Sequence, residues 1–310
     1  MSGQTITNYD TLVQAIQDWL ARSDITDTSY TPELVQIAQN NIYYGYTDNK
    51  GNYWPGLRVR AMETAFPGGN ILTTTITGGT GYSSGDTVSF DVAGSNTVPP
   101  TPGVTATGTL VVTSGVITGL RLTNPGQGYT VAPNVHISSA GGSGGSITTT
   151  ITSGPTISPS GNLSVPYNYL DIKYLYITDS GGNTVRLERK AAEWIYKYYP
   201  DRTSDSAPTY FARDGGVFVF GPFPDSSYIV SGIYYAKSSV LSSGNETDWM
   251  ITNYPHLVLY ASLAEAAKFV RRDPNEISMW ENALQNVMNS IRVGNDREGW
   301  SGSPLAITPG

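Results

Sequence analysis

The apolar side chains in the first part of the chain recur at helical spacing. Residues 9–22 repeat large apolar side chains at intervals of three and four, which predicts an amphipathic helix. Asn8 or Asp10 can cap the start of this helix. A second helix is predicted to begin near Pro32, because Thr31 is a suitable N-cap and proline fits the first helical position. The chain is therefore expected to begin with a pair of helices.

The C-terminal part shows the same helical pattern. One helix is predicted to begin at Pro255. Another follows Asp273, which stands at the cap position with Glu276 three residues later. Its apolar stripe continues until Gly294, where we expect the helix to end. Residues 295–310 have no periodicity and are predicted to form an extended C-terminal tail.

Residues 67–156 differ from both ends, because helical spacing gives way to short alternating runs. The segment is rich in Thr, Gly, Ser and Val, and its runs at residues 110–112 and 119–122 alternate as strands do. We expect an inserted all-β, sandwich-like domain. The charged side chains of the segment are Asp86, Asp91 and Arg121.

The same segment contains an internal repeat. Residues 79–82 (GTGY) and 126–129 (GQGY) have the same form, and a valine follows each tyrosine at the same interval. Two copies of one unit indicate a small β-domain with pseudo-symmetry. Tyr82 and Tyr129 are candidate contact residues that would stack on a carbohydrate. The alternative is that each glycine pair forms a tight turn and each tyrosine packs on the sheet.

The remaining segments mix strands and helices. A short helical piece is predicted at 57–65, a strand at 172–178 and an amphipathic helix at 188–199. Residues 217–220 and 228–236 are predicted to form a hairpin around a proline-containing turn. The fold class expected from these elements is α+β, a helical bundle with a β-hairpin or small sheet.

The predicted domains follow from these changes in pattern. Residues 1–66 and 157–294 are expected to form one discontinuous α+β body, residues 67–156 an inserted β-domain, and residues 295–310 the tail. An insertion of this kind is tolerated where the two chain ends of the host domain lie close together on its surface.

Composition excludes several classes of protein. The 310 residues carry a formal net charge of −7, and only 14% are charged, where ordinary domains have roughly a quarter. The absence of cysteine excludes disulfide frameworks, zinc ribbons and thiol nucleophiles. An acidic chain is poorly suited to gripping nucleic acid. The sequence shows no signal peptide and no apolar run of the roughly 20 residues that a membrane span needs, so we expect synthesis in the cytoplasm.

Candidate catalytic residues are few. His136 and His256 fall in different predicted domains, and each is expected to be a surface or capping side chain. No GxxxxGK[ST], HExxH or GxSxG motif is present, and Asp86 with Asp91 are too few for a calcium site. We expect no enzyme activity, no metal and no cofactor. Paired carboxylates could support glycoside hydrolysis, and the candidate pairs are Glu188 with Glu193 and Glu276 with Glu281. Both pairs fall on predicted helices with basic residues nearby, so we expect them to be helix-surface charges.

A series of longer motifs appears in a specific order. The motifs are TLVQAIQDWLARSDI (11–25), LRVRAMET (57–64), a Pro-Tyr-x-Tyr-Leu strand entry (166–170), LERK (187–190), APTYFARDGG (207–216), FGPFPDSSYIVSGIYYAK (220–237), LSSGNETDWM (241–250) and YPHLVLYASLAEAAKFVRRD (254–273). In combination they resemble the head-to-tail adaptor (connector) proteins of short-tailed bacteriophages. The resemblance covers nearly all of the predicted α+β body. The loop near residues 46–56 is longer than in that pattern, and residues 67–156 are extra.

The resemblance implies a structural virion protein at the head–tail junction, assembled in the host cytoplasm. It implies a homo-oligomeric ring of about twelve copies docked on the portal protein, with heterologous contacts between neighbours. The ring would extend the DNA channel without binding DNA specifically and would carry the tail nozzle or tail tube protein. Tail fibres are a further expected partner, through residues 67–156. Portal-docking residues expected in the tail are Trp300, Pro304, Leu305 and Ile307.

Two other functions remain open at this point. The β-segment alone would fit a carbohydrate- or protein-binding module of a virion or secreted protein. A peptidoglycan hydrolase carried on the tail would need a carboxylate with a raised pKa in an apolar cleft.

Overall fold

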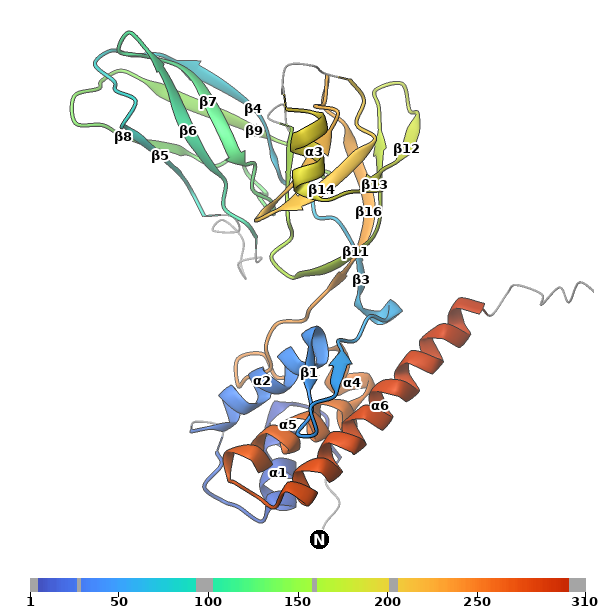
Figure 1. Cartoon of the computed structure of the whole chain (residues 1–310). Helices are drawn as coiled ribbons and strands as arrows, with labels where there is room; N and C mark the ends of the chain where they lie inside the picture. Colours follow the sequence, from blue (N-terminus) through green and yellow to red (C-terminus); the bar gives the residue numbers. More distant parts are fainter. Residues whose placement is uncertain (1–4, 27–28, 93–102, 158–160, 201–205, 301–310) are drawn as a thin grey trace, which may run out of the picture. The chain divides into compact units, whose positions relative to one another are not determined.

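The chain divides into two compact units, each described here by itself. The computed structural model describes residues 5–26, 29–92, 103–157, 161–200 and 206–300 (Figure 1). The helical unit consists of Met1–Glu63 and Tyr235–Gly310, and the β unit is Thr64–Tyr234. The helical unit is thus formed by the two ends of the chain. Residues 157–234 cluster with residues 67–156 in the β unit.

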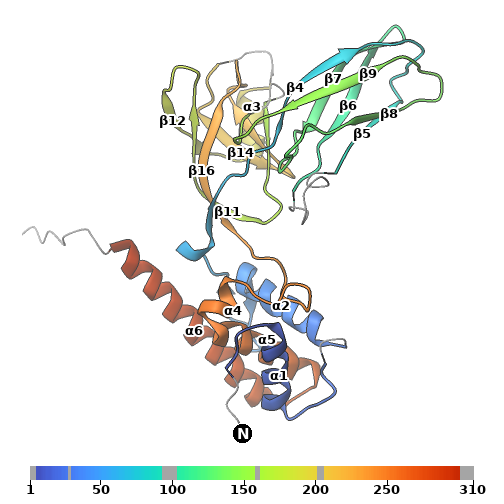
Figure 2. The ribbon, with the colours of Figure 1, turned by 180° about the vertical axis from the view of Figure 1, so that it is seen from behind.

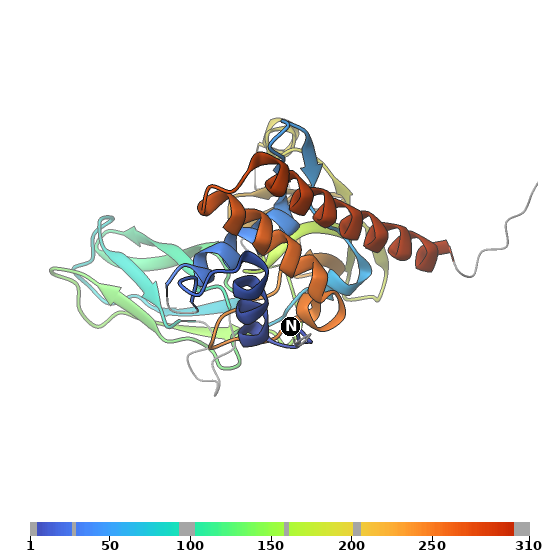
Figure 3. The same cartoon turned by 90° about the horizontal axis from the view of Figure 1, so that it is seen from below.

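The central element of the helical unit is α5. Nine of its 15 residues are buried, on nearly every side, which is the pattern of a helix enclosed by others. The other helices of this unit pack against it, and Figure 3 shows α5 among them. The helices are α1 (Tyr9–Leu20), α2 (Thr31–Tyr44), α4 (Trp249–Asn253), α5 (Pro255–Phe269) and α6 (Pro274–Trp300). None of the helices in the described ranges is long and apolar enough to cross a bilayer.

Local capping signals set the starts of these helices. Asn8 and Thr11 form a capping box, in which each side chain accepts the other residue's backbone N–H at 3.0 Å. Asp273 accepts the backbone N–H of Asn275 at 2.8 Å, just ahead of α6. The predicted helix starts at residues 9, 255 and 274 are confirmed.

The end of α6 corrects the prediction. The helix does not stop at Gly294 but continues to Trp300, so residues 295–300 are not an extended tail. Glycine inside a helix costs only about 1 kcal/mol relative to alanine, which the flanking helical residues overcome. Residues 301–310 of the predicted tail lie outside the described residues.

A hairpin follows α2 and lies on the surface of the helical unit. Its strands β1 (Gly45–Thr47) and β2 (Tyr53–Pro55) pair antiparallel. Asp48 organises the turn by accepting backbone N–H groups of Lys50 and Asn52 at 2.9 and 2.8 Å. Partial burial acts to raise the pKa of Asp48, but these hydrogen bonds and those from side chains outweigh it and hold the pKa well below its usual range. Residues 57–65, predicted helical, instead contain a 3₁₀ turn, η1 (Arg60–Met62), and the short strand β3 (Glu63–Ala65).

An ionic cluster joins this hairpin to α5 and α6. Glu281 is only 2% exposed, and its Oε2 accepts the backbone N–H of Asn49 at 3.2 Å. The Lys268 ammonium lies 3.1 Å from Glu281 Oε1 and 2.9 Å from Glu265 Oε1. Burial lowers the pKa of Lys268, but the two carboxylates outweigh burial and raise the pKa above its ordinary value. Lys268 therefore stays charged at neutral pH and compensates a buried carboxylate.

We expect Lys268→Met to lower the free energy of unfolding of the helical unit by about 3 kcal/mol, because it leaves the Glu281 carboxylate buried without its counter-ion. Adding Glu281→Gln should recover much of this loss. Chemical unfolding followed by helical circular dichroism measures both. The control is Lys50→Met, which removes an exposed charge from the same unit. If Lys268→Met and Lys50→Met had equal effects, the cluster would not stabilise the fold.

Two four-stranded sheets are formed by the second half of the β unit together with β3. Their strand orders are β10-β15-β14-β13 and β12-β11-β16-β3, with the short helix α3 (Ala192–Tyr198) beside β14. The predicted helix at 188–199 is therefore shorter, because its first residues form β13. Strand bounds are β10 (Asn162–Ser164), β11 (Tyr169–Thr178), β12 (Thr184–Arg186), β13 (Glu188–Arg189), β14 (Tyr210–Asp214), β15 (Val217–Gly221) and β16 (Ile229–Ala236).

The predicted hairpin between residues 217–220 and 228–236 is wrong. β15 and β16 belong to different sheets, and β15 pairs with β14 and β10 instead. The hairpin forms one element earlier, where Gly215 and Gly216 connect β14 to β15 and Gly215 has φ of 57°. A Gly-Gly pair between strands favours a two-residue hairpin turn, and this signal competes successfully with the longer turn after residue 221.

The first half of the β unit, residues 67–156, is built from antiparallel pairs. In its described residues β4 pairs with β9, β5 with β8, and β6 with β7 (Figure 2). Two clusters of buried apolar side chains fill the space between these pairs. With both helices and several small sheets, the chain is an α+β protein, as predicted. Strand bounds are β4 (Ile71–Thr77), β5 (Thr87–Phe90), β6 (Thr107–Thr113), β7 (Val116–Asn124), β8 (Val135–Ser138) and β9 (Ser146–Ile151).

Candidate functional site

The two GxGY units of the sequence adopt the same backbone conformation. All four of their glycines have positive φ, where residues with a side chain are strained. The residue between the two glycines of each unit forms an isolated antiparallel bridge. Thr80 pairs with Ser143, and Gln127 pairs with Val104. The sequence repeat is therefore a structural repeat. The four φ values are 64° at Gly79, 79° at Gly81, 68° at Gly126 and 79° at Gly128.

The tyrosines of the two units make matching hydrogen bonds. The Tyr82 hydroxyl accepts the backbone N–H of Gly145 at 3.0 Å, and the Tyr129 hydroxyl accepts that of Ala106 at 2.9 Å. In each case the donor stands two residues after the bridge partner of the same unit. The first unit is thus bound by the segment before β9, and the second unit by the segment before β6.

Strand pairing in residues 67–156 links two halves of the segment. β4, β5 and β6 form the first half, β7, β8 and β9 form the second, and every strand pair joins one strand from each half. Tyr82 donates its backbone N–H to the carbonyl of Gly115, just before β7, and Tyr129 donates its own to the carbonyl of Gly69, just before β4. The segment therefore has internal pseudo-twofold symmetry with the two halves interlocked.

This geometry corrects the interpretation of Tyr82 and Tyr129 as contact residues. Their exposed fractions are 8% and 6%, and each ring belongs to one of the two apolar clusters. Burial raises the pKa of the Tyr129 hydroxyl, which also donates to the carbonyl of Asp91 at 2.9 Å. Rings enclosed in this way cannot stack on a ligand, so the alternative of packing under a tight turn describes both residues.

We expect Gly79→Ala to lower the stability of the β unit by at least about 2 kcal/mol, because a left-handed alanine is strained and its Cβ would meet backbone. That Cβ would lie 2.4 Å from the nitrogen of Gly145 and 2.5 Å from the oxygen of Ser143. Thermal unfolding followed by near-ultraviolet circular dichroism of the tyrosines measures the loss. The matched control is Gly154→Ala, whose Cβ meets nothing within 4 Å. Equal melting temperatures for the two variants would contradict the tight-turn role of the motif.

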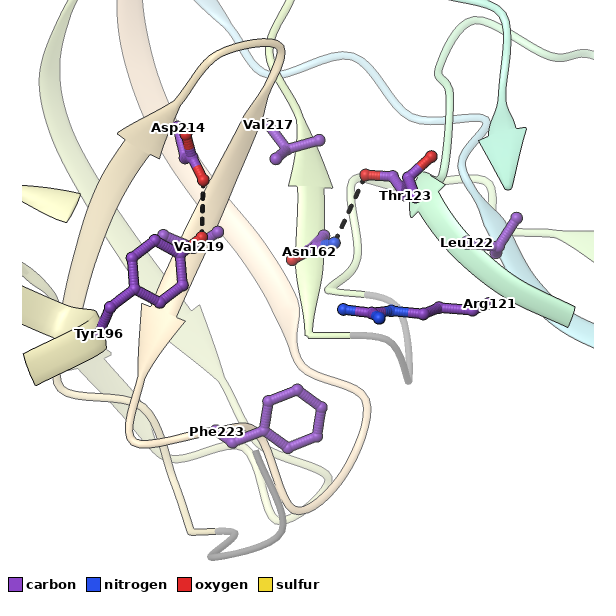
Figure 4. Close-up of a pocket in the computed structure, with 9 residues that line it drawn as sticks. All are labelled: Arg121, Leu122, Thr123, Asn162, Tyr196, Asp214, Val217, Val219 and Phe223. Atoms are coloured by element: carbon purple, nitrogen blue, oxygen red, sulfur yellow. Dashed lines mark hydrogen bonds between the residues drawn. The ribbon is translucent and has the colours of Figure 1, made fainter. Parts of the chain in front are cut away.

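A cleft of about 460 Å³ opens between β7 and the sheet that contains β10, β14 and β15 (Figure 4). Arg121 extends into it and forms no ion pair with any described residue. On the opposite wall the Tyr196 hydroxyl donates to Asp214 Oδ2 at 2.6 Å. Its described lining holds one carboxylate, whereas glycoside hydrolysis requires two. The lining residues are Arg121, Leu122, Thr123, Asn162, Tyr196, Asp214, Val217, Val219 and Phe223.

Of the histidines and carboxylates singled out in the sequence, the structure brings His136 and Asp91 together and places His256 and Glu276 elsewhere. Exposed His136 has Nε2 2.8 Å from Asp91 Oδ1, and His256 stacks on Tyr260 with ring centroids 6.0 Å apart. Glu276 lies 3.9 Å from Arg272 in a partly buried pair of the helical unit. Among the described residues no three His, Cys, Asp or Glu side chains gather where they could hold a metal ion.

The remaining candidate residues belong to the C-terminal end. Trp300 is the last residue of α6. Its side chain, and all of Pro304, Leu305 and Ile307, lie outside the described residues.

One comparison with known proteins bears on the whole C-terminal half of the chain. The model of a protein family described as SU10 adaptor protein matches residues 145–308, more than half of the chain. The matched part begins near β9 and includes α3 to α6. Comparison with curated proteins finds none that matches.

Proposed function

The chain belongs to the SU10 adaptor protein family, which makes it a phage adaptor-type protein with a structural role in the virion, and we propose that it forms the ring that joins the portal to the tail of a short-tailed phage. The family match over residues 145–308 carries this proposal. The ring would contain about twelve copies, with unlike faces of neighbours in contact. It would sit at the head–tail junction and assemble in the host cytoplasm.

The charge of the chain suits a channel wall. DNA binding is driven by Lys and Arg that neutralise phosphates, and the net charge of −7 opposes it. A wall that repels the phosphate backbone lets DNA pass without being held. In this proposal the ring extends the portal channel and supports the tail nozzle or tail tube protein.

The C-terminal end would dock on the portal. α6 has 27 residues and spans about 40 Å, so its C-terminal end lies well away from the buried part of α5. Within the helical unit, its C-terminal end extends past the other helices (Figures 1 and 3). The apolar side chains of Trp300, Pro304, Leu305 and Ile307 would provide the docking contacts.

Residues 67–156 would be an inserted, sandwich-like domain on a body of residues 1–66 and 157–294. Support comes from their strands, which in the described residues pair only with one another. In the ring this domain would contact tail fibres or the next tail component. A carbohydrate- or protein-binding role is the second candidate function, and the cleft of Figure 4 favours it, because Arg121, Asn162 and two aromatic rings line one concave surface.

We expect the purified chain to form rings of about twelve copies when mixed with its portal, as measured by native mass spectrometry.

A double substitution, Leu305→Asp with Ile307→Asp, should abolish portal binding, because charge cannot replace apolar contacts in a desolvated interface. The matched control is Ser301→Asp with Ser303→Asp, which adds the same charge to the same segment. A chain that stays monomeric with the portal would refute the ring, and equal binding by both double variants would refute tail docking.

A further inference from the structure

The outer face of α2 carries a stripe of large apolar side chains that the helical unit leaves exposed. Tyr30, Ile37 and Tyr44 are 46%, 45% and 52% exposed and are spaced by seven residues, which places them on one face of the helix. We call these three residues the α2 stripe. The opposite face of α2 is buried against α5, so the stripe is additional to the core of the unit.

Neighbouring side chains lengthen this apolar surface at both ends. The ring of Tyr30 lies 4.8 Å, centroid to centroid, from that of Phe269, which is itself half exposed. At the other end the Tyr53 hydroxyl donates to the carbonyl of Tyr44 at 3.3 Å. A continuous exposed surface of aromatic and aliphatic side chains is typical of a protein–protein interface.

A second helix of the same unit has a free face of the same length. Met279 and Val293 on α6 are each 50% exposed and stand fourteen residues apart. Between them on this face lie Ala283, Asn286 and Ser290, which are short side chains. We call these five residues the α6 stripe. The opposite face of α6 is buried, since Trp280 and Leu284 are in the core and Glu281 contacts the hairpin.

The two stripes match in length, and the middle of the α6 stripe has smaller side chains than the middle of the α2 stripe. Each spans fourteen residues, which is about 21 Å of helix. The α2 stripe has large side chains at its centre and ends, whereas the α6 stripe has small ones across its middle. Large side chains of one helix fit between small ones of another when helices pack side by side. Both stripes are exposed in the same chain, so they do not cover each other within it.

We propose that the α2 stripe of one copy of this chain packs against the α6 stripe of the next copy. The contact joins two unlike faces, so each copy keeps one free stripe of each kind. Such a heterologous contact propagates from copy to copy and closes into a ring when the rotation between copies allows it. This inference rests on the proposed ring and assigns the faces that hold it together.

The absence of cysteine from the chain allows a direct test by disulfide trapping. Ile37 is at the middle of the α2 stripe and Asn286 is at the middle of the α6 stripe, so they meet whichever way the helices run. The double variant Ile37→Cys with Asn286→Cys, oxidised at the concentration where wild type forms rings on the portal, should give a ladder of covalent multimers. A mixture of the two single variants should stop at covalent dimers that contain one of each.

The matched control is Ser239→Cys with Asn286→Cys, because Ser239 is exposed in the same unit and lies outside both stripes. It should give no ladder. A second measurement avoids cysteine: Ile37→Asp should weaken self-association at least tenfold, with unchanged helical circular dichroism, and Ser239→Asp should not.

Three results would overturn the assignment. One is wild-type rings on the portal with no ladder from the double variant. Another is covalent dimers from Ile37→Cys alone, which would mean that α2 pairs with α2. The third is a chain that binds the portal as a single copy. A ladder without the portal would support the contact even where portal binding fails, so the contact and the proposed adaptor function can fail separately.

Discussion

The burial of α5 on nearly all sides is the constraint that organises the chain. A helix this apolar needs neighbours around its whole circumference, and α4 and α6, which flank it in sequence, cover only part of it. The rest is covered by α1 and α2, from the opposite end of the chain. The helical unit is therefore complete only when both ends of the chain, up to Glu63 and from Tyr235, have packed around α5. In the sequence, the β unit lies between these two parts of the helical unit.

Residues 67–156 are stabilised by pairing between their two halves. A half of three short strands would have unpaired edges and too little apolar surface to be stable alone. Here each half supplies the partners for the other, and each buried tyrosine hydroxyl accepts an N–H from the opposite half. The glycines with positive φ let the backbones approach closely enough for those bonds. Stability thus comes from the pairing of the repeats, with very few charges.

Local signals in the sequence were sufficient for the starts of the long helices and for the repeat. The strand pairings and the ends of several helices depend on contacts between residues far apart in the sequence, which those signals do not contain. Asn8, Pro255 and Asp273 act within one helical turn, so they predict helix starts from sequence alone. The pairing of β15 could not be read in the same way, because two turns, at Gly215 and after Gly221, compete for one strand. The inward orientation of Tyr82 and Tyr129 depends on Gly145 and Ala106, which are distant in sequence. The α2 stripe has a signal in the sequence, since Tyr30, Ile37 and Tyr44 are spaced by seven residues. The spacing alone does not tell an exposed face from the buried face of the same helix, and the structure is needed to show that these side chains are exposed.

The low charge of the chain also follows from its pairing pattern. In β4 and β9, threonines face threonines across the two strands, at Thr73 with Thr150, Thr74 with Thr149 and Thr75 with Thr148. The hydroxyl oxygens of Thr73 and Thr150 are 2.5 Å apart. Branched side chains favour the extended backbone, and their hydroxyls satisfy one another or water, so the sheet needs no ion pairs on its exposed face. Surface charge is therefore not required for the fold of this segment. The ionic contact with a clear structural role lies in the helical unit, where Lys268 compensates the buried Glu281.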